Sequence, residues 1–165
     1  MRPVSQLTGL HRKSGVILDT NILLLYFVGT VDKARISTFK RTQTFAPEDF
    51  DTLISFLRSF DKIVTLPNIL SEVSNFLGQL KGKLKQVCFQ SFACGIDLLD
   101  EQYLPSNRIA ERSEFVRFGL TDTAILELAR ANYLVLTDDF ELLGYLNAKG
   151  LHAINFNHIR VYNWQ

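Results

Sequence analysis

The chain has 165 residues, of which 47% are hydrophobic and 21% are charged, and its formal net charge at pH 7 is +1. This composition is typical of one globular domain with a single core, and it excludes disordered and fibrous proteins. A near-neutral charge argues against a wide polyanion-binding face, so we expect any contact with nucleic acid to be local.

No segment indicates targeting to a membrane. The first fourteen residues, MRPVSQLTGLHRKS, contain no apolar stretch long enough for a signal peptide, and no later run could span a bilayer. We therefore expect a cytoplasmic protein with one domain over residues 1–165, in which residues 1–14 form an N-terminal extension. Cys88 and Cys94 have no metal-ligand spacing, and we expect both to be small buried residues.

Apolar runs and segments with helical spacing alternate along the chain. The predicted elements are a strand over 15–19, a helical region from 22–28, a helix over 48–60, a strand over 62–66, helices over about 68–80, 85–99 and 121–131, a strand over 133–137, a short helix over 140–149 and a strand over 152–155. Thr121 is expected to cap its helix, and residues 105–118 give the weakest signal. Strands separated by helices pair in parallel, which predicts an α/β fold, a three-layer α/β/α sandwich with a mostly parallel central sheet.

Acidic residues directly follow two of the predicted strands. Asp19 ends the first strand, within the run GVILDTNILLLYFVG, and Asp138 and Asp139 follow the strand YLVLT. In open parallel sheets, ligands bind beyond the carboxyl ends of the strands, where the strand order reverses. We therefore expect these carboxylates to meet at one edge of the sheet.

Two predicted helices carry further acids. Asp122 shares a helix face with Ile125, so its carboxylate is expected to point toward the sheet, although the helix dipole favours a first-turn acid whatever its function. Glu72 lies between Ile69 and Phe76 at helical spacing, on the border of an apolar face. Taken alone it is a solvated residue, whereas beside the other acids it becomes a candidate ligand.

Several carboxylates at one edge repel one another and stay ionised together only beside a cation. Mg²⁺ and Mn²⁺ suit oxygen-only sites, where such an ion lowers the pKa of a bound water and offsets charge on a phosphodiester. His11, His152 and His158 show no ligand spacing, so a general base separate from the metal would have to be a carboxylate.

Four motifs in this order resemble one family, the PIN-domain nucleases, and VapC-like bacterial toxins in particular. The motifs are LDTN (18–21), SEV (71–73), LTDTAI (120–125) and LTDD (136–139), and the resemblance covers about residues 15–155. It implies a PIN-like fold in which four acids bind one or two Mg²⁺ or Mn²⁺ ions and are the catalytic residues. Those acids are Asp19, Glu72, Asp122 and Asp139, with Asp138 as the alternative ligand in the TxD element.

The same resemblance implies supporting roles and an activity. Asn21 would hydrogen-bond to the first acid, and Thr20 and Thr137 would support the loop backbone. The implied activity is that of an endoribonuclease, a phosphodiester hydrolase that cleaves single-stranded RNA with a metal-activated water and no covalent enzyme intermediate.

The biological role and assembly are open at this point. A toxin of a toxin–antitoxin pair would have a cognate antitoxin as its partner, and the resemblance also favours a homodimer. The N-terminal extension and the long interval between residues 28 and 62 depart from the compact toxin pattern. Housekeeping RNA processing therefore stays open as an alternative role.

Two other classes of protein compete with this interpretation. Haloacid-dehalogenase-type phosphatases also place an Asp after a first strand and a DD pair after a later one, but they need a second acid where this chain has Asn21. They also need a lysine, which Lys81 or Lys83 would have to supply. The second alternative is a non-catalytic PIN-like module that binds RNA or a protein, against which the presence of all four acids argues.

The sequence does not define the residues that contact RNA. Basic clusters near Arg12 and Arg41 are solvated faces in the simplest interpretation, although they would also suit phosphate contacts. Most aromatic residues have core spacing, and a few are candidates for stacking on bases. These are Phe27, Phe140, Tyr145 and Trp164.

Overall fold

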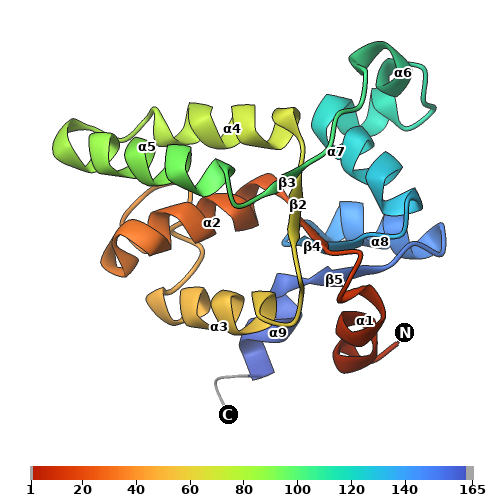
Figure 1. The fold of residues 1–165 in the computed structure, drawn as a ribbon, viewed down its shortest axis with the longest axis horizontal. Helices are drawn as coiled ribbons and strands as arrows, with labels where there is room; N and C mark the ends of the chain where they lie inside the picture. The colour runs from red at the N-terminus through yellow and green to blue at the C-terminus, as the bar shows by residue number, and fades with distance from the viewer. Residues whose placement is uncertain (1, 163–165) are drawn as a thin grey trace.

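The computed structural model describes residues 2–162 and contains a five-stranded sheet surrounded by helices (Figure 1). The strands are β1 (Val16–Leu18), β2 (Ile63–Thr65), β3 (Asp100–Glu101), β4 (Leu134–Thr137) and β5 (Ala153–Asn155). Their order across the sheet is β3-β2-β1-β4-β5, and all four pairings are parallel. The predicted α/β class with a parallel central sheet is confirmed.

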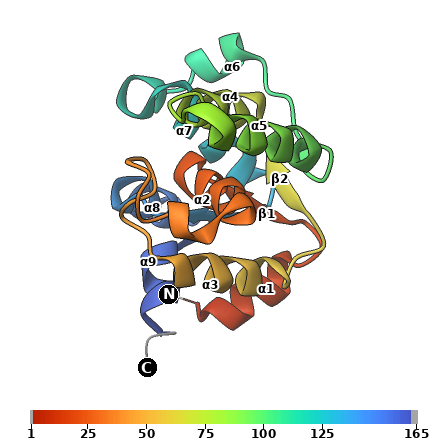
Figure 2. The same ribbon diagram turned by 90° about the vertical axis from the view of Figure 1, so that its left-hand side faces the viewer.

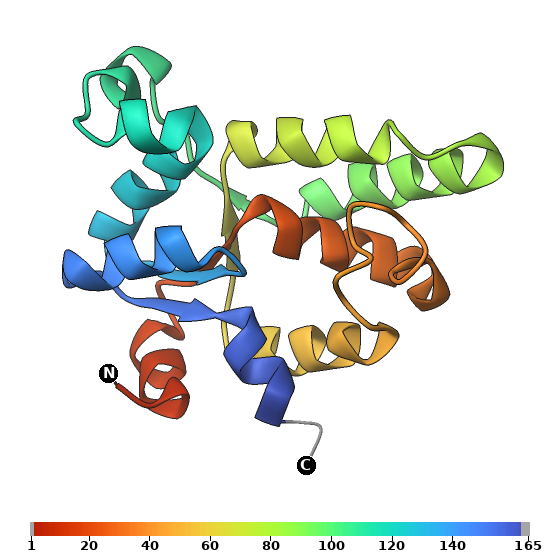
Figure 3. The ribbon, with the colours of Figure 1, turned by 180° about the vertical axis from the view of Figure 1, so that it is seen from behind.

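The helices cover both faces of this sheet. They are α1 (Val4–His11), α2 (Thr20–Val31), the 3₁₀ turn η1 (Lys33–Arg35), α3 (Pro47–Leu57), α4 (Pro67–Leu77), α5 (Gly82–Ile96), α6 (Ser106–Ala110), α7 (Phe115–Arg130), α8 (Phe140–Ala148) and α9 (Phe156–Tyr162). Helices α2 to α5 lie on one side of the sheet and α7 and α8 on the other, as Figure 1 and Figure 3 show from opposite directions. Figure 2 shows α6 and α7 at the opposite end of the molecule from α1 and α9. The arrangement is the predicted three-layer sandwich.

The central strands form the middle of the core. Every residue of β1 and β4 is buried, as expected for parallel strands whose two faces are both covered by helices. Helix α2 is also buried over most of its surface, and the ring of Phe27 packs edge-on against Phe92 of α5. A Cβ atom on Gly95 would lie 2.3 Å from the Phe27 ring, so glycine is what allows α5 to approach α2 this closely. Phe27 is therefore a core residue, and its interpretation as a stacking candidate is wrong.

The predicted strands and the longer helices are found where the apolar pattern placed them, whereas α1, β3, α6 and α9 were not predicted. The apolar pattern did not predict strand β3, because this strand consists of two acidic residues and has no apolar run. Its pairing with β2 and an ion pair of 2.5 Å between Asp100 and Lys62 hold it in the sheet. Cys88 is buried as predicted, but Cys94 is exposed, which corrects the expectation for it.

Helix α7 is broken at Gly119, whose φ of 72° and ψ of −170° suit only glycine. The break corresponds to the helix start predicted at Thr121. Among the described residues, no backbone N–H donates to the Thr121 hydroxyl as the expected cap requires; the hydroxyl instead donates a hydrogen bond of 2.5 Å to Glu72. Within residues 2–162, no helix has both the length and the hydrophobicity needed to cross a bilayer.

Candidate active site

The sheet reverses its strand order between β1 and β4, and the first two acids meet at this point. Leu18 pairs with Leu136, so the carboxyl ends of the two strands lie side by side. The backbone N–H of Asp138 donates to Oδ2 of Asp19 over 3.1 Å. Parallel pairing thus brings together two acids that are 119 positions apart in the chain.

Asp19 is buried at the first turn of α2, with 6% of its surface exposed. Its Oδ1 accepts a hydrogen bond of 2.9 Å from the backbone N–H of Ile22, so it caps the helix as well as facing the site. Burial and the neighbouring charge of Asp138 raise the pKa of Asp19 to about 8, although hydrogen bonds from Thr137 and from the two backbone N–H groups oppose this rise. An ionised Asp19 is therefore costly here unless a cation lies nearby.

Glu72 is held by two threonine hydroxyls from different elements. Thr20, at the start of α2, donates to Oε2 over 2.6 Å, and Thr121 of α7 donates to Oε1 over 2.5 Å. Both carboxylate oxygens are oriented, so Glu72 is not a freely solvated residue. Thr20 therefore positions an acid from another helix, which corrects the expectation that it supports the loop backbone.

Asp122 lies in the second part of α7, half-buried among other acids. Burial, together with the charges of Asp139, Glu72 and Glu141, raises its pKa to about 6. Glu141 was not among the predicted site residues, although its position two residues after Asp139 in TDDFE was a visible signal. It forms an ion pair of 2.8 Å with Arg117, and both side chains are more than half exposed.

The two acids after β4 have different surroundings. Oδ1 of Asp138 accepts a hydrogen bond of 3.1 Å from Asn21, which therefore orients this acid and not Asp19 as expected. Oδ1 of Asp139 caps α8 by accepting from the backbone N–H groups of Glu141 and Leu142. Asp138 neighbours Asp19 while Asp139 neighbours Asp122, so the geometry keeps both as candidate ligands.

Thr137 has a position that supports the loop backbone, the role that the family resemblance implied. It is fully buried at the end of β4, and its Oγ1 accepts a hydrogen bond of 2.9 Å from the backbone N–H of Asp139. The hydroxyl also bonds to Asp19 and lowers its pKa. One side chain thus connects the carboxylate after β1 with the turn after β4.

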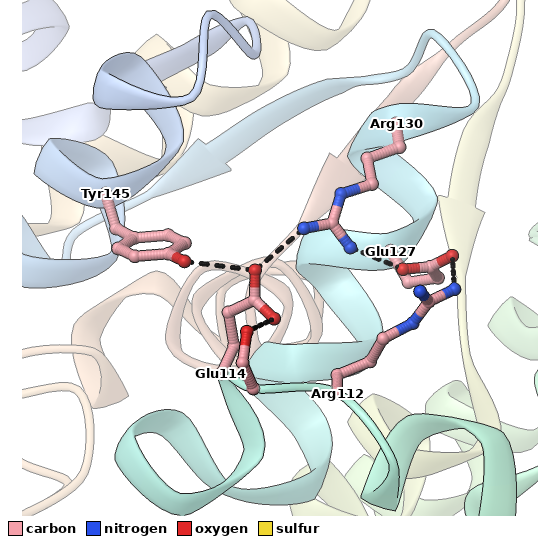
Figure 4. Close-up of polar contacts among 6 residues, drawn as sticks. Arg112, Glu114, Glu127, Arg130 and Tyr145 are labelled. Atoms are coloured by element: carbon pink, nitrogen blue, oxygen red, sulfur yellow. Dashed lines mark hydrogen bonds and ion pairs between the residues drawn. The ribbon is translucent and has the colours of Figure 1, made fainter.

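A network of charged side chains braces the broken helix α7 against α8 (Figure 4). Glu114 accepts from Arg130 over 2.7 Å and from the Tyr145 hydroxyl over 3.0 Å, while Arg112 and Arg130 both bind Glu127. Its hydrogen bonds lower the pKa of Glu114 to about 2, although burial opposes this. The network fixes the helix that carries Asp122. Because its hydroxyl belongs to this network, Tyr145 is a structural residue in the described fold.

The donor set suits a hard divalent cation. Its ligands would all be carboxylate oxygens, the donors that Mg²⁺ and Mn²⁺ prefer. Within residues 2–162, none of the five acids is ion-paired with an arginine or lysine: Asp19, Glu72, Asp122, Asp138 and Asp139. In the same residues, no three Asp, Glu, His or Cys side chains are grouped closely enough to hold a metal ion as they stand. Binding one ion through three or more of these carboxylates would therefore require them to move closer together.

Other candidate residues lie outside this acidic edge. His11 is buried, and its ring bonds to His152 at 2.6 Å, beside the start of β5. Lys81 and Lys83 are exposed beyond the C-terminal end of α4, whereas the acids gather at the N-terminal ends of the helices. Neither lysine therefore has the position that the phosphatase alternative needs. Phe140 is 61% exposed beside Asp139, and Trp164 lies outside the described residues.

A comparison with protein-family models finds no match for the chain, and a comparison with curated proteins finds none either. The function proposed below is therefore argued from the residues of the acidic edge, from the order of the strands that carry them, and from the motif resemblance.

Proposed function

We propose that this protein is a metal-dependent endoribonuclease of the PIN type, which hydrolyses single-stranded RNA. The observation that supports this most directly is the meeting of acids from β1, α4, α7 and β4 at one sheet edge, without a paired basic side chain within residues 2–162. Structural acids at such density normally have arginine or lysine partners, because unpaired charges in a buried site are costly. A divalent cation would supply the missing positive charge, and a phosphodiester of the RNA would be the substrate.

The residues have separate tasks in this proposal. Asp19, Glu72, Asp122 and one of the two acids after β4 would hold Mg²⁺ or Mn²⁺, which lowers the pKa of a bound water and offsets charge on the phosphate. Thr20 and Thr121 fix both oxygens of Glu72 by hydrogen bonds, so that carboxylate is already oriented.

The proposed reaction is a single displacement. The oxygen of water attacks phosphorus, the bond from phosphorus to one ribose oxygen breaks, and that oxygen takes up a proton from the solvent as it leaves. A carboxylate of the edge takes the proton from the water. The protein itself forms no covalent bond to the RNA.

The role in the cell and the partners belong to the same proposal. As the toxin of a toxin–antitoxin pair in the cytoplasm, the protein would form a homodimer, and a cognate antitoxin would cover the acidic edge. Housekeeping RNA processing would need no such inhibitor.

The proposal is tested by cleavage of a mixed-sequence single-stranded RNA with Mn²⁺, with Mg²⁺ and with EDTA. The wild type is compared with Asp19→Asn and with Asp61→Asn, a matched control whose carboxylate is more than half exposed and pairs with Arg12. We expect cleavage that needs metal, is lost in Asp19→Asn and is unchanged in Asp61→Asn. Cleavage in EDTA, or equal cleavage by both variants, would contradict the proposal.

The non-catalytic alternative gives a different result in the same assay. A module that only binds RNA would retain the labelled RNA in a filter-binding measurement, would not cleave it with either metal, and would bind equally well as Asp19→Asn. Metal-independent binding without cleavage would therefore replace the nuclease proposal with the binding module.

A further inference from the structure

A cavity of about 960 Å³ adjoins the acidic edge. Glu72 and Asp122 both line it, so it opens directly beside two of the candidate metal ligands. Its remaining walls come from the start of α4, from the segment after β3 and from the region around the break in α7. Figure 1 shows the segment that leaves β3 passing between α4 and α7 on its way to α6.

Tyr103 lines this cavity with a ring that is anchored but largely exposed. It follows the carboxyl end of β3, where the backbone N–H of Gln102 bonds to the carbonyl of Thr65 over 2.9 Å. The Tyr103 hydroxyl donates to Glu101 over 2.6 Å, while 73% of the residue's surface is exposed. An aromatic ring held in place before a ligand arrives loses little conformational entropy when another ring stacks on it.

A polar side chain in the same cavity has hydrogen-bonding groups that the described fold does not use. Asn68 is half-buried in the first turn of α4, and its amide makes no hydrogen bond within residues 2–162. An amide both donates and accepts, which suits the edge of a base. Leu104 and Leu120 add apolar surface. The acids on the wall would repel a phosphate, so a neutral, flat, hydrogen-bonding group fits this cavity better.

We propose that the cavity is a subsite for one unstacked nucleobase of the single-stranded RNA substrate, with Tyr103 stacking on the base and Asn68 bonding to its edge. This inference rests on the proposed function, because a base held here belongs to a nucleotide next to the bond that the acidic edge would cleave. It deepens that function by assigning substrate selection to the segment after β3 and to α4.

The test is a fluorescence titration of 2-aminopurine ribonucleoside monophosphate, whose emission is quenched on stacking. The protein carries Asp19→Asn and the buffer contains EDTA, so neither a metal nor cleavage is needed. We expect saturable quenching that adenosine monophosphate reverses and ribose 5-phosphate does not. Adding Tyr103→Ala should weaken binding about tenfold, in line with the usual contribution of one stacked base. Tyr103→Phe keeps the ring and should retain binding.

Tyr133→Ala is the matched control, because Tyr133 precedes β4 at the opposite edge of the sheet. It should bind the nucleotide as the parent does. Asn68→Ala should bind more weakly and discriminate less between adenine and uracil nucleotides. Quenching that is absent at about millimolar protein, that persists in Tyr103→Ala or that ribose 5-phosphate reverses would overturn the inference.

Failure of this inference and failure of the nuclease proposal have different signatures. If the wild type cleaves RNA and Tyr103→Ala cleaves it with the same base preference, the subsite is wrong and the nuclease stands. If the wild type cleaves nothing but the nucleotide still binds through Tyr103, the subsite stands and the nuclease is wrong.

Discussion

Glu114 and Arg130 form an ion pair of 2.7 Å although sixteen positions separate them along the same helix. A straight helix of that length would rise about 24 Å, so the contact exists only because α7 is broken at Gly119. The pair, together with the Tyr145 hydroxyl, holds the two parts of α7 in the arrangement that presents Thr121 and Asp122 to the acidic edge.

Glu114→Gln should destabilise the fold in a pH-dependent way. The pKa of Glu114 is lowered from 4.5 to about 2, so the folded state favours the ionised form. Its contribution to the free energy of unfolding is present above pH 4.5 and is lost as the pH falls toward 2. Near neutral pH the variant should lose about 1–3 kcal/mol, measured by urea unfolding. If the difference in free energy of unfolding between the wild type and Glu114→Gln stays constant down to a pH of about 2, this account is contradicted.

Gly119→Ala should cost about 1–3 kcal/mol and reduce cleavage, because alanine does not tolerate this backbone conformation. Gly144→Ala in α8 is the matched control. A Cβ atom at either glycine has no neighbour within 4 Å, so the two substitutions differ only in backbone strain. Gly144→Ala should be neutral or stabilising by up to about 1 kcal/mol. Thermal unfolding measures both changes, and equal effects at the two positions would refute the role of the break.

Asp138→Ala and Asp139→Ala should differ in stability, whichever of the two acids is needed for cleavage. Asp139 caps α8 through two backbone N–H groups, and a cap is worth about 1 kcal/mol. Asparagine caps almost as well as aspartate, so Asp139→Ala, and not Asp139→Asn, should show this loss. Comparing cleavage rates with unfolding midpoints separates the ligand from the cap. If neither Asp138→Asn nor Asp139→Asn changes the rate, the turn after β4 is not part of the active site.

The buried His11 should make the protein less stable in mild acid. Its Nδ1 lies 3.0 Å from the carbonyl of Asn132, which can only accept, so Nδ1 carries a proton and Nε2 accepts from His152. Burial, together with the nearby His152 and Arg2, lowers the pKa of His11 below 6.5. The unfolded chain therefore binds a proton more readily, and stability falls as the pH drops below 6.5.

Urea unfolding between about pH 5 and pH 8 measures this loss of stability. His11→Gln should lower stability at all pH values and flatten the profile. His158→Gln, which removes an exposed ring, is the matched control for the loss of a histidine. A wild-type profile that is flat across this range would show that His11 keeps an ordinary pKa.

The sequence by itself determined the alternation of elements and the position of most acids. Continuous apolar runs at β1 and β4 reflect strands covered on both faces, so they were visible in the sequence alone. Because parallel strands share one carboxyl edge, Asp19 and Asp138 could be expected to meet before any contact was known. Periodicity also placed Glu72 and Asp122 on the helices that carry them.

The tertiary structure decided the contacts that no local pattern encodes. Strand β3 is acidic and two residues long, so only pairing with β2 makes it a strand, and only that pairing brings Tyr103 to the cavity. The partners of Glu72 lie on α2 and α7, about 50 positions away in both directions. Local propensity reports on neighbours within a few residues, whereas these bonds exist because the sheet fixes where distant segments end.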